Sequence, residues 1–516
     1  MSSHRSLARF ALPLIAALSC SPLWAQQTQS PDSPPTMAQI EAAWQARDFE
    51  AARAGLAALA ATTTDPLVQF RYARMLIDGI GGPRDPAQGM SLLDQAIAQG
   101  YVPAQVLQAR VLLSPGPARN PERAAALLSN AAARGTSEAQ YYLGLLHLNG
   151  TGVAKDPQAA FNWLLAASEG QYGPAQLELA KLYISGVGTA PNPGQAAYWM
   201  QEAAARNIAE AQFQWAEMLA QGLVQGQATP DALDWYAKAG QQGHVLAQRT
   251  LGTLYLTGAE GVDPDATLAV QWLTAAADAG DVRAMNNLGV AYGTGTVLPQ
   301  DDAQAFEWLL TASDEGLAQA SFVLGRMYEA GRGTPANLDK AVATYRLAAT
   351  QGSQQAMARL GTLTLAGTLD DVVAPHDAVD WVMAQIDQND AALPWMQAQA
   401  EAGVRPAQAA LGKWYASQPA RAAEGYALIE LAARAGHVPS QFSLGRALTT
   451  GDGIALDYVA AHTWLNIAAT SGHEQAITTR DLITDLMTPD QLAEAQDATR
   501  AFFEAERAGP LGAQDN

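Results

Sequence analysis

The sequence of 516 residues contains a single cysteine, Cys20, and it lies close to the N-terminus. A chain with one thiol cannot form an internal disulfide, so the fold must be held together by packing and hydrogen bonds. Removal of a leader that includes Cys20 would leave no cysteine nucleophile. The sequence also lacks a G-x-S-x-G motif, so nothing indicates a serine hydrolase of that class.

Basic residues are scarce. The chain has 30 Lys and Arg against 50 Asp and Glu, for a formal net charge of −20. Loss of a 25-residue leader, which holds Arg5, Arg9 and no acidic residue, would make the charge −22. Nucleic-acid binding requires an excess of cations to neutralise phosphates, so we expect no nucleic-acid partner. An anionic polysaccharide is disfavoured for the same reason, whereas a basic partner suits this charge.

Long hydrophobic runs are also missing. The apolar stretch at 10–18 (FALPLIAAL) is too short to span a bilayer, and it follows Arg5 and Arg9. This arrangement predicts a signal peptide over residues 1–25, cut after Ala25, and export to the periplasm. The alternative is cleavage before Cys20, which would leave a lipid anchor on Cys20 and an outer-membrane lipoprotein facing the periplasm. We expect no transmembrane segment.

No stretch sustains the alternation of a β-strand, so we expect an all-α fold. One position instead holds Gly or Ala at intervals of 33 to 37 residues, with a single interval of 51. We call this the small column: Ala73, Ala109, Gly144, Ala180, Ala216, Gly252, Gly289, Gly325, Gly361, Gly412 and Gly445. A mid-helix glycine costs roughly 1 kcal/mol relative to alanine. Its recurrence indicates that a partner helix passes close to this position.

Each repeat reads as two short helices joined by a loop, as in residues 136–170. Such units stack into a solenoid, here a right-handed α-solenoid of about eleven repeats. An aromatic column recurs in the second helix: Trp163, Trp199, Trp235, Trp272, Trp308, Tyr345 and Trp464. Helix ends in the left-handed conformation are expected at Gly135, Gly170, Asn207, Gly243, Gly280, Gly316, Gly352, Gly436 and Gly472.

Two of the columns have alternative interpretations. The aromatic column fits core packing, although a surface that stacks on carbohydrate would also use tryptophan. A glutamine column follows the alanines of the first helix: Gln69, Gln105, Gln140, Gln176, Gln212, Gln248, Gln408 and Gln441. Its amides could hydrogen-bond from repeat to repeat or line the inner surface.

The domain plan begins with the predicted signal peptide and continues to a short tail. Its segments are a disordered linker at 26–35, a capping hairpin at 36–64, the solenoid at 65–472, capping helices at 473–507 and a disordered tail at 508–516. The repeat at 353–403 is irregular. It holds one possible second helix around Trp381 and another around Trp395, and one of the two is expected to be an insertion of about 15 residues.

The repeats resemble the Sel-one-like repeat (SLR) family, a relative of the tetratricopeptide repeat. One repeat carries the pattern closely in Ala284, Leu288, Gly289, Tyr292, Gly293, Gly295, Trp308 and Gly316. The resemblance implies a tetratricopeptide-like α-solenoid that holds other proteins together and is not an enzyme. Bacterial exported members include adaptors in envelope and exopolysaccharide assembly.

Other motifs favour structure over chemistry. Gly-x-Gly loops such as Gly150/Gly152 and Gly293/Gly295 follow helices, whereas a dinucleotide loop follows a strand. His244, His437 and His473 occupy the same turn position in three different repeats, so they are separated in space and we expect no metal site. The carboxylate pairs Asp301-Asp302 and Asp370-Asp371 fit loops or helix starts.

The sequence therefore predicts a non-enzymatic periplasmic scaffold that binds protein partners and needs no cofactor. The alternative is an envelope or exopolysaccharide-assembly component, lipid-anchored through Cys20. The partner-binding residues are left unidentified. We expect them where the repeats disagree, above all at 362–403 and on the exposed positions of the first helices.

Overall fold

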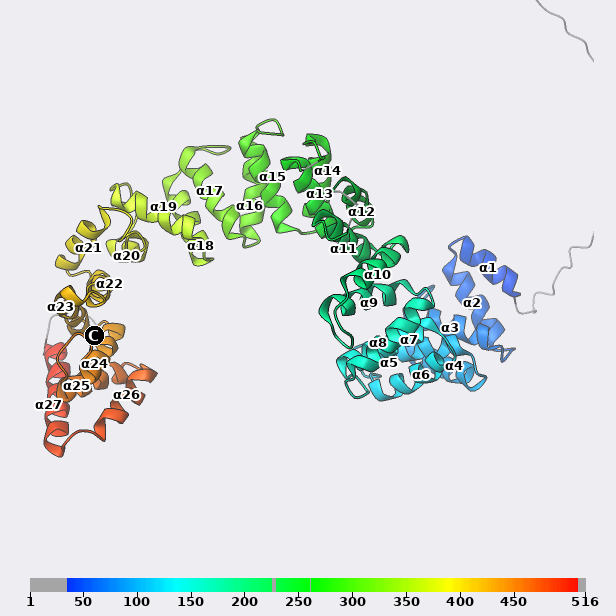
Figure 1. Cartoon of the computed structure of the whole chain (residues 1–516), viewed down its shortest axis with the longest axis horizontal. Coiled ribbons are helices and arrows are strands. Elements are labelled where there is room, and N and C mark those ends of the chain that lie inside the picture. Colours follow the sequence, from blue (N-terminus) through cyan, green and yellow to red (C-terminus); the bar gives the residue numbers. More distant parts are fainter. Residues whose placement is uncertain (1–34, 225–228, 260, 509–516) are drawn as a thin grey trace, which may run out of the picture. The chain divides into compact units, whose positions relative to one another are not determined.

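The computed structural model describes residues 35–224, 229–259 and 261–508. In this part of the chain the regular structure is helical, with one isolated β-bridge between Ala259 and Val262 (Figure 1). The all-α prediction is confirmed. The chain divides into two compact units, Met1–Ala211 and Gln212–Asn516, each of which is described by itself. The predicted leader, Cys20, the linker up to residue 34 and the tail after residue 508 lie outside the described residues.

The first unit is a stack of helix pairs. Its helices are α1 (Met37–Gln45), α2 (Phe49–Ala60), α3 (Pro66–Asp78), α4 (Pro86–Ala98), α5 (Val102–Leu113), α6 (Pro121–Ala133), α7 (Ser137–Asn149), α8 (Pro157–Glu169), α9 (Gly173–Ser185) and α10 (Pro193–Ala205). The hairpin of α1 and α2 begins at Thr36, which forms the reciprocal capping box with Gln39.

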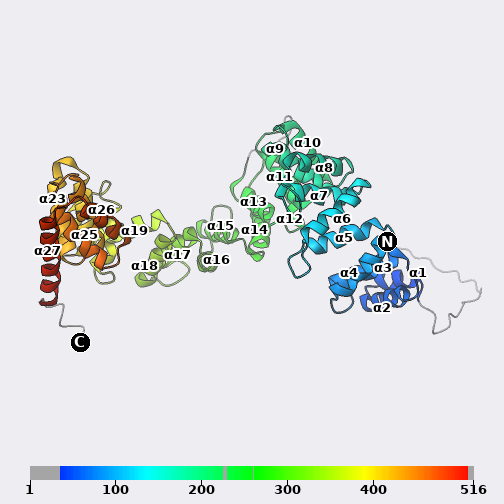
Figure 2. The ribbon, with the colours of Figure 1, turned by 90° about the horizontal axis from the view of Figure 1, so that it is seen from below.

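The second unit continues the same pairing from α11 (Ala209–Ala220), within which the boundary falls. Its further helices are α12 (Thr229–Gln241), α13 (Val245–Thr257), α14 (Ala266–Asp278), α15 (Val282–Thr294), α16 (Asp302–Asp314), α17 (Ala318–Ala330), α18 (Leu338–Thr350), α19 (Gln354–Leu365), α20 (Pro375–Met383), α21 (Ala392–Glu401), α22 (Arg405–Ala416), the 3-10 turn Pro419–Arg421, α23 (Ala422–Arg434), α24 (Val438–Thr450), α25 (Tyr458–Thr470), α26 (Glu474–Thr484) and α27 (Pro489–Ala508). First helices of neighbouring repeats, such as α15 and α17, contact one another (Figure 2).

Helix ends follow the local sequence. Many second helices start at an Asp or Asn whose side chain accepts a backbone N–H, as Asp156 does from Ala159 at 3.0 Å. The left-handed residue at the end of the second helix is Gly or Asn in most repeats, but in one it is Gln171 (φ 62°) and not Gly170 (φ −73°). The prediction for Gly170 was therefore wrong by one residue, because the left-handed position directly precedes the next helix cap.

The Gly-x-Gly loops are confirmed as structural. Gly150 ends α7 in the left-handed conformation. A Cβ on Gly152 would collide with the carbonyl of Pro121 at the start of the preceding second helix. The pair Gly293/Gly295 was placed two residues too early, because Gly293 lies inside α15 and Gly295 ends that helix as Gly150 ends α7.

The small column marks the closest approach within each helix pair. A Cβ on Gly289 would lie 2.5 Å from Cγ of Leu309, and one on Gly325 would lie 2.6 Å from the ring of Tyr345. Both distances are below van der Waals contact. At these two crossings glycine avoids the clash. Alanine takes the same place opposite other large side chains, as Ala180 does before Met200 and Ala216 before Tyr236.

The predicted aromatic column is not the one that fills the crossing point. We call the second-helix residue at that point the crossing residue. The fully buried position follows each tryptophan by one residue: Leu164, Met200, Tyr236, Leu273, Leu309, Tyr345 and Leu465. Tyr345 belongs to this column and not to the tryptophans, of which Trp308 is half-buried. Tyr345 donates to Glu329 at 2.7 Å, and Tyr236 donates to Glu217 at the same distance. Burial, and then these hydrogen bonds, raise the pKa of both phenols above its ordinary value.

The glutamine column joins repeats. Gln248, Gln408 and Gln441 each donate to the carbonyl eight residues earlier, at 2.9, 3.0 and 3.0 Å. That carbonyl belongs to the last turn of the preceding second helix, where it has no partner within its own helix. These three glutamines therefore join neighbouring repeats through backbone carbonyls. Gln69 and Gln105 instead donate to side-chain amides of the helix that follows, Gln95 at 3.0 Å and Asn130 at 3.1 Å.

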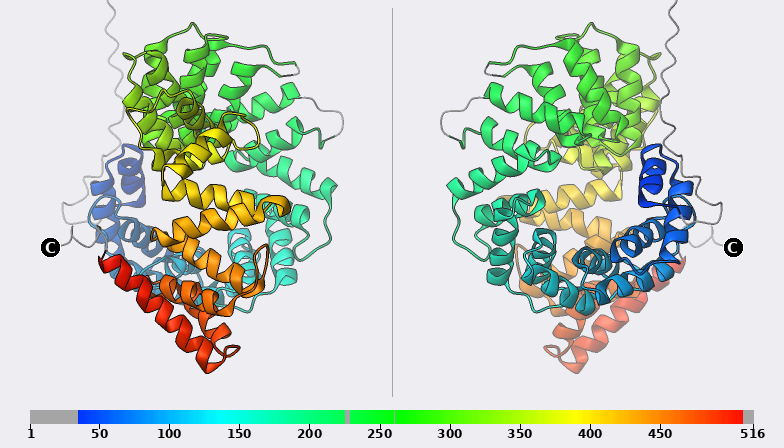
Figure 3. Two further views of the ribbon diagram at one scale, coloured as in Figure 1. Left: turned by 90° about the vertical axis from the view of Figure 1, so that its left-hand side faces the viewer. Right: turned by 90° about the vertical axis from the view of Figure 1, so that its right-hand side faces the viewer.

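The C-terminal helix lies elsewhere than predicted. Thr488 and Gln491 form a capping box at the start of α27, at 3.0 and 3.3 Å. However, α27 packs along α25, with Phe502 against Trp464, and does not close the end of the stack (Figure 3). Leu482, in α26, and Leu486, just after it, consequently stay 67% and 63% exposed.

Alanine at Gly289 should destabilise the protein, because overpacking at the crossing with Leu309 costs about 1–3 kcal/mol. Alanine at Gly293, in the same helix, meets its nearest neighbour at 3.5 Å and should gain up to about 1 kcal/mol from helix propensity. Urea unfolding followed by far-UV circular dichroism compares the two variants. Equal stabilisation by both would refute the close approach.

Candidate functional site

The repeat pattern breaks between α19 and α22. A Cβ on Gly361 of α19 would lie 2.5 Å from the carbonyl oxygen of Trp381 in α20, so α20 takes the crossing position. The carbonyl that Gln408 of α22 binds belongs to Ala400 of α21. Both possible second helices therefore form, and they divide the contacts that a single helix makes in other repeats. The prediction that one of them is a separate insertion does not describe this arrangement.

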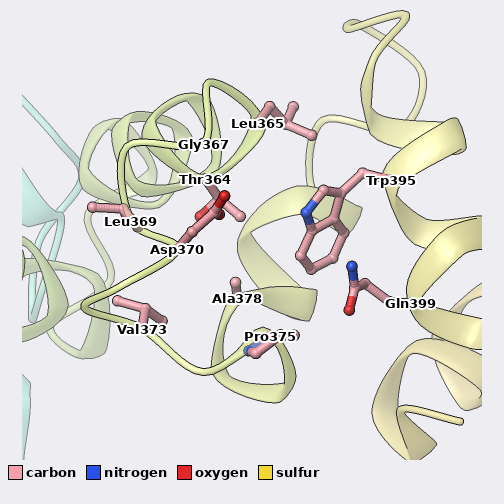
Figure 4. Close-up of a pocket in the computed structure, with 10 residues that line it drawn as sticks. All are labelled: Thr364, Leu365, Gly367, Leu369, Asp370, Val373, Pro375, Ala378, Trp395 and Gln399. Atoms are coloured by element: carbon pink, nitrogen blue, oxygen red, sulfur yellow. The ribbon is translucent and has the colours of Figure 1, made fainter. Parts of the chain in front are cut away.

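A cavity of about 430 Å³ lies between the turn after α19 and helix α21 (Figure 4). Its lining is Thr364, Leu365, Gly367, Leu369, Asp370, Val373, Pro375, Ala378, Trp395 and Gln399. The indole of Trp395 projects from α21, with the Gln399 amide one turn further along the helix. Asp370 faces them from the opposite wall. We call this the Trp395 pocket.

One carboxylate, Asp370, lines the pocket, and the segment that forms it is strongly acidic. Residues 360–404 contain seven acidic residues and no lysine or arginine: Asp370, Asp371, Asp377, Asp380, Asp387, Asp390 and Glu401. Asp377 pairs with Arg346 at 3.5 Å and lies 3.4 Å from His376. Within the described part of the chain the other six form no ion pair. Their combined field therefore favours a cation in the pocket.

The pocket also offers a ring face and an amide. Trp395 is half-buried, and it packs partly on the apolar residues of α19, α20 and α22. Neither its indole N–H nor the Gln399 side chain has a hydrogen-bond partner among the residues described. A lysine or arginine over an indole gains about 0.5–2 kcal/mol, and a facing carboxylate strengthens the attraction. This chemistry suits recognition of a basic side chain.

The histidines lie apart from this pocket. His244 and His473 cap α13 and α26, where their Nδ1 atoms accept from backbone N–H groups at 3.2 and 3.3 Å. His437 precedes α24, and its Nδ1 lies 2.8 Å from Oγ of Ser440. These placements confirm the predicted turn positions. His147 lies in α7, where its buried Nδ1 has no partner among the described residues. In that same part of the chain no three His, Cys, Asp or Glu side chains gather as a metal site would require.

The carboxylate pairs have separate roles. Asp301 caps α16 and accepts from two backbone N–H groups at 3.0 Å. Asp302 pairs with Arg332 of the next repeat, and hydrogen bonds from Arg332 hold the pKa of Asp302 below its ordinary value. Asp370 and Asp371 lie in the turn after α19. In the sequence, Asp370 belongs to a carboxylate pair and Trp395 to a possible helix, with nothing to connect them. The fold brings both to the wall of one cavity.

The family profile of the Sel1 repeat matches nine segments of the chain. They are residues 66–101, 112–136, 137–172, 173–208, 209–244, 245–281, 282–317, 318–353 and 438–473. The chain is a Sel1 repeat protein. The profile matches nothing from residue 354 to residue 437, and this interval contains the Trp395 pocket. Sel1 repeat proteins generally mediate interactions between proteins, so the segment that departs from the repeat is the first place to look for specificity.

Solved structures agree with this family. This Sel1 repeat protein is 23% identical to a protective antigen of uropathogenic Escherichia coli that displays an SLR fold. That match covers 91% of this chain and 95% of the antigen, with a TM-score of 0.55. A Sel1 repeat protein of Oxalobacter formigenes is 29% identical over 63% of this chain and 90% of its own, with a TM-score of 0.43. No curated protein matches the sequence.

Methionine at Gln408 should lower the stability of the protein by weakening the attachment of α21 to α22. It removes one of the two hydrogen bonds to the Ala400 carbonyl, which keeps the bond from the Gly403 N–H at 3.1 Å, at a cost of about 0.5–1.5 kcal/mol. Methionine at the exposed Gln388, whose side chain makes no hydrogen bond in the described structure, is the matched control and should change stability by less than about 0.5 kcal/mol. Urea unfolding measures both variants. Equal stability of the two would exclude the hydrogen bond as the restraint on α21.

Proposed function

We propose that this Sel1 repeat protein is a non-enzymatic scaffold of the periplasm that binds a protein partner at the Trp395 pocket. The supporting observation is the cavity of about 430 Å³ inside the interval that the family profile leaves unmatched. Residues that recur in every repeat make the fold, as the small column and the glutamine column do. A side chain found in one repeat only is free to serve recognition.

The charge around the pocket favours a basic partner. Six unpaired carboxylates in residues 360–404 would repel an acidic surface and attract a basic one. The Trp395 ring and the facing Asp370 suit a lysine or arginine side chain. We therefore propose that a basic segment of the partner enters the pocket. The volume accommodates one or two side chains, so the neighbouring first helices would supply further contact area.

The runner-up function is a component of envelope or exopolysaccharide assembly, held at the outer membrane by a lipid on Cys20. The supporting observation is the sequence Ala17-Leu18-Ser19-Cys20 after an apolar core. No helix of the described chain combines the length and the apolar character needed to cross a bilayer.

Capture of partners from a periplasmic extract tests the scaffold function. The chain from residue 26 onward should retain a protein that is lost at least tenfold from an Asp370→Lys variant, because the reversed charge repels a basic segment. Lysine at the exposed Asp278, in α14, is the control and should retain it. Quantitative mass spectrometry compares the three eluates. Retention of glycans without protein would contradict the scaffold function, and equal retention by both variants would exclude the pocket.

Analysis of the N-terminus of the purified protein distinguishes a free periplasmic protein from a lipoprotein. We expect an intact mass that corresponds to cleavage after Ala25 and no incorporation of labelled fatty acid. A Cys20→Ser variant is the control and should be exported and cut in the same way. Label that appears on the wild type and disappears from Cys20→Ser would establish the lipoprotein form.

A further inference from the structure

One segment of the acidic second unit has an excess of basic residues. Residues Gln212–Asn516 hold 35 of the 50 acidic residues but only 16 of the 30 basic ones. Within residues 402–451 the balance reverses, with five basic and two acidic residues: Arg405, Lys413, Arg421, Arg434, Arg446, Glu424 and Glu430. Both acids pair locally, Glu424 with Arg421 at 2.6 Å and Glu430 with Arg434 at 2.5 Å. The remaining cations therefore have no carboxylate of their own in this stretch.

Lys413 and Arg446 occupy the same repeat position, one residue after the small column. In the first unit that position is ion-paired, as Arg74 is with Asp78 at 3.7 Å and Lys181 with Glu178 at 2.8 Å. Asp78 follows Arg74 by four residues. The residues four positions after Lys413 and Arg446 are Ser417 and Thr450, which carry hydroxyls where Asp78 carries a carboxylate. Neither cation forms an ion pair with any described residue.

These cations and hydroxyls border one cavity of about 490 Å³ between α22 and α24. The apolar part of its wall comes from Ile429, Phe442, Ala416 and Ala447, with Tyr426 beside them. We call this the Lys413–Arg446 pocket. Lys413 and Arg446 are both exposed, so their charged ends are accessible to a ligand.

A third donor faces the same cavity. His473 accepts a backbone N–H at Nδ1, and in the neutral ring its proton must then be on Nε2, where it can be donated. The ring is held in place by stacking on Phe442, with centroids 4.4 Å apart. One carboxylate, Asp452, also borders the cavity, and it forms no ion pair with either cation.

The cations of this segment also act on His437, at the start of α24. Burial, and then the charges of Lys413 and Arg405, lower the pKa of His437 below its ordinary value. A positive field therefore persists at the start of α24, although the whole unit is strongly acidic. An anion can be bound here, whereas a long polyanion would meet the carboxylates on either side.

We propose that the Lys413–Arg446 pocket binds a carboxylate-bearing peptide segment of a protein partner, in which an acidic residue adjoins an apolar one. Two cations and an imidazole N–H bind the carboxylate, and the wall of Phe442 and Ile429 covers the apolar side chain. Inorganic phosphate would use the cations and the imidazole but not the apolar wall. This site is separate from the Trp395 pocket, and it takes a ligand of the opposite charge.

The test is an array of octapeptides in which two glutamates flank each of the twenty amino acids in turn. The same array with glutamines is the peptide control. The protein from residue 26 onward should bind glutamate peptides with a flanked aromatic or aliphatic residue and ignore the glutamine series. A Lys413→Gln/Arg446→Gln variant should bind at least tenfold more weakly. Both positions are exposed, so we expect the variant to fold, and circular dichroism checks this.

Two further arms isolate the pocket. Arg434→Gln removes an exposed cation that is already paired with Glu430, and binding should be unchanged. Asp370→Lys should also leave binding unchanged, which separates this result from any failure at the Trp395 pocket. Equal binding of the peptides by wild type and the double variant would overturn the proposal. Binding of inorganic phosphate with no binding of any glutamate peptide would overturn it as well.

Discussion

The close approach of the two helices in each pair is the constraint on which this structure depends. Where a glycine of the first helix lies under a leucine or tyrosine of the second, no Cβ fits between them. The crossing residue is thereby buried completely, and it provides the central contact in a helix pair too short to bury its own apolar face. Tyrosine is accepted at this crossing because Glu217 or Glu329 satisfies its hydroxyl.

Stacking of one pair on the next uses two kinds of polar contact. In five repeats a glutamine donates to a carbonyl at the end of the preceding second helix. Met285 and Met357 take its place in the middle of the second unit. There, ion pairs link successive repeats, Arg332 to Asp302 and Arg359 to Glu329. The hydrogen bonds from Arg359 lower the pKa of Glu329, so this link persists at neutral pH and weakens on acidification.

The interval that departs from the repeat concentrates the unusual chemistry. Residues 360–404 carry only negative charge and surround a tryptophan. Residues 402–451 carry an excess of positive charge around a second cavity. Two cavities of opposite charge in neighbouring segments of the chain can discriminate between partners, because a wrong orientation places like charges together. A scaffold gains specificity in this way without altering the residues that stack its repeats.

The sequence by itself determined the helix pairs, their caps and the column of close approach, because these depend on local spacing and on Gly, Asp and Pro at fixed positions. It misassigned Gly170 and Tyr345 by one residue and Gly293 by two, since neighbouring columns hold similar residues and only the fold shows which one takes each place. Tertiary structure alone decided that α20 and α21 share one role and that α27 lies on α25. It also brought Asp370 to Trp395, and Lys413 to Arg446, because those pairs come from elements whose packing no local pattern encodes.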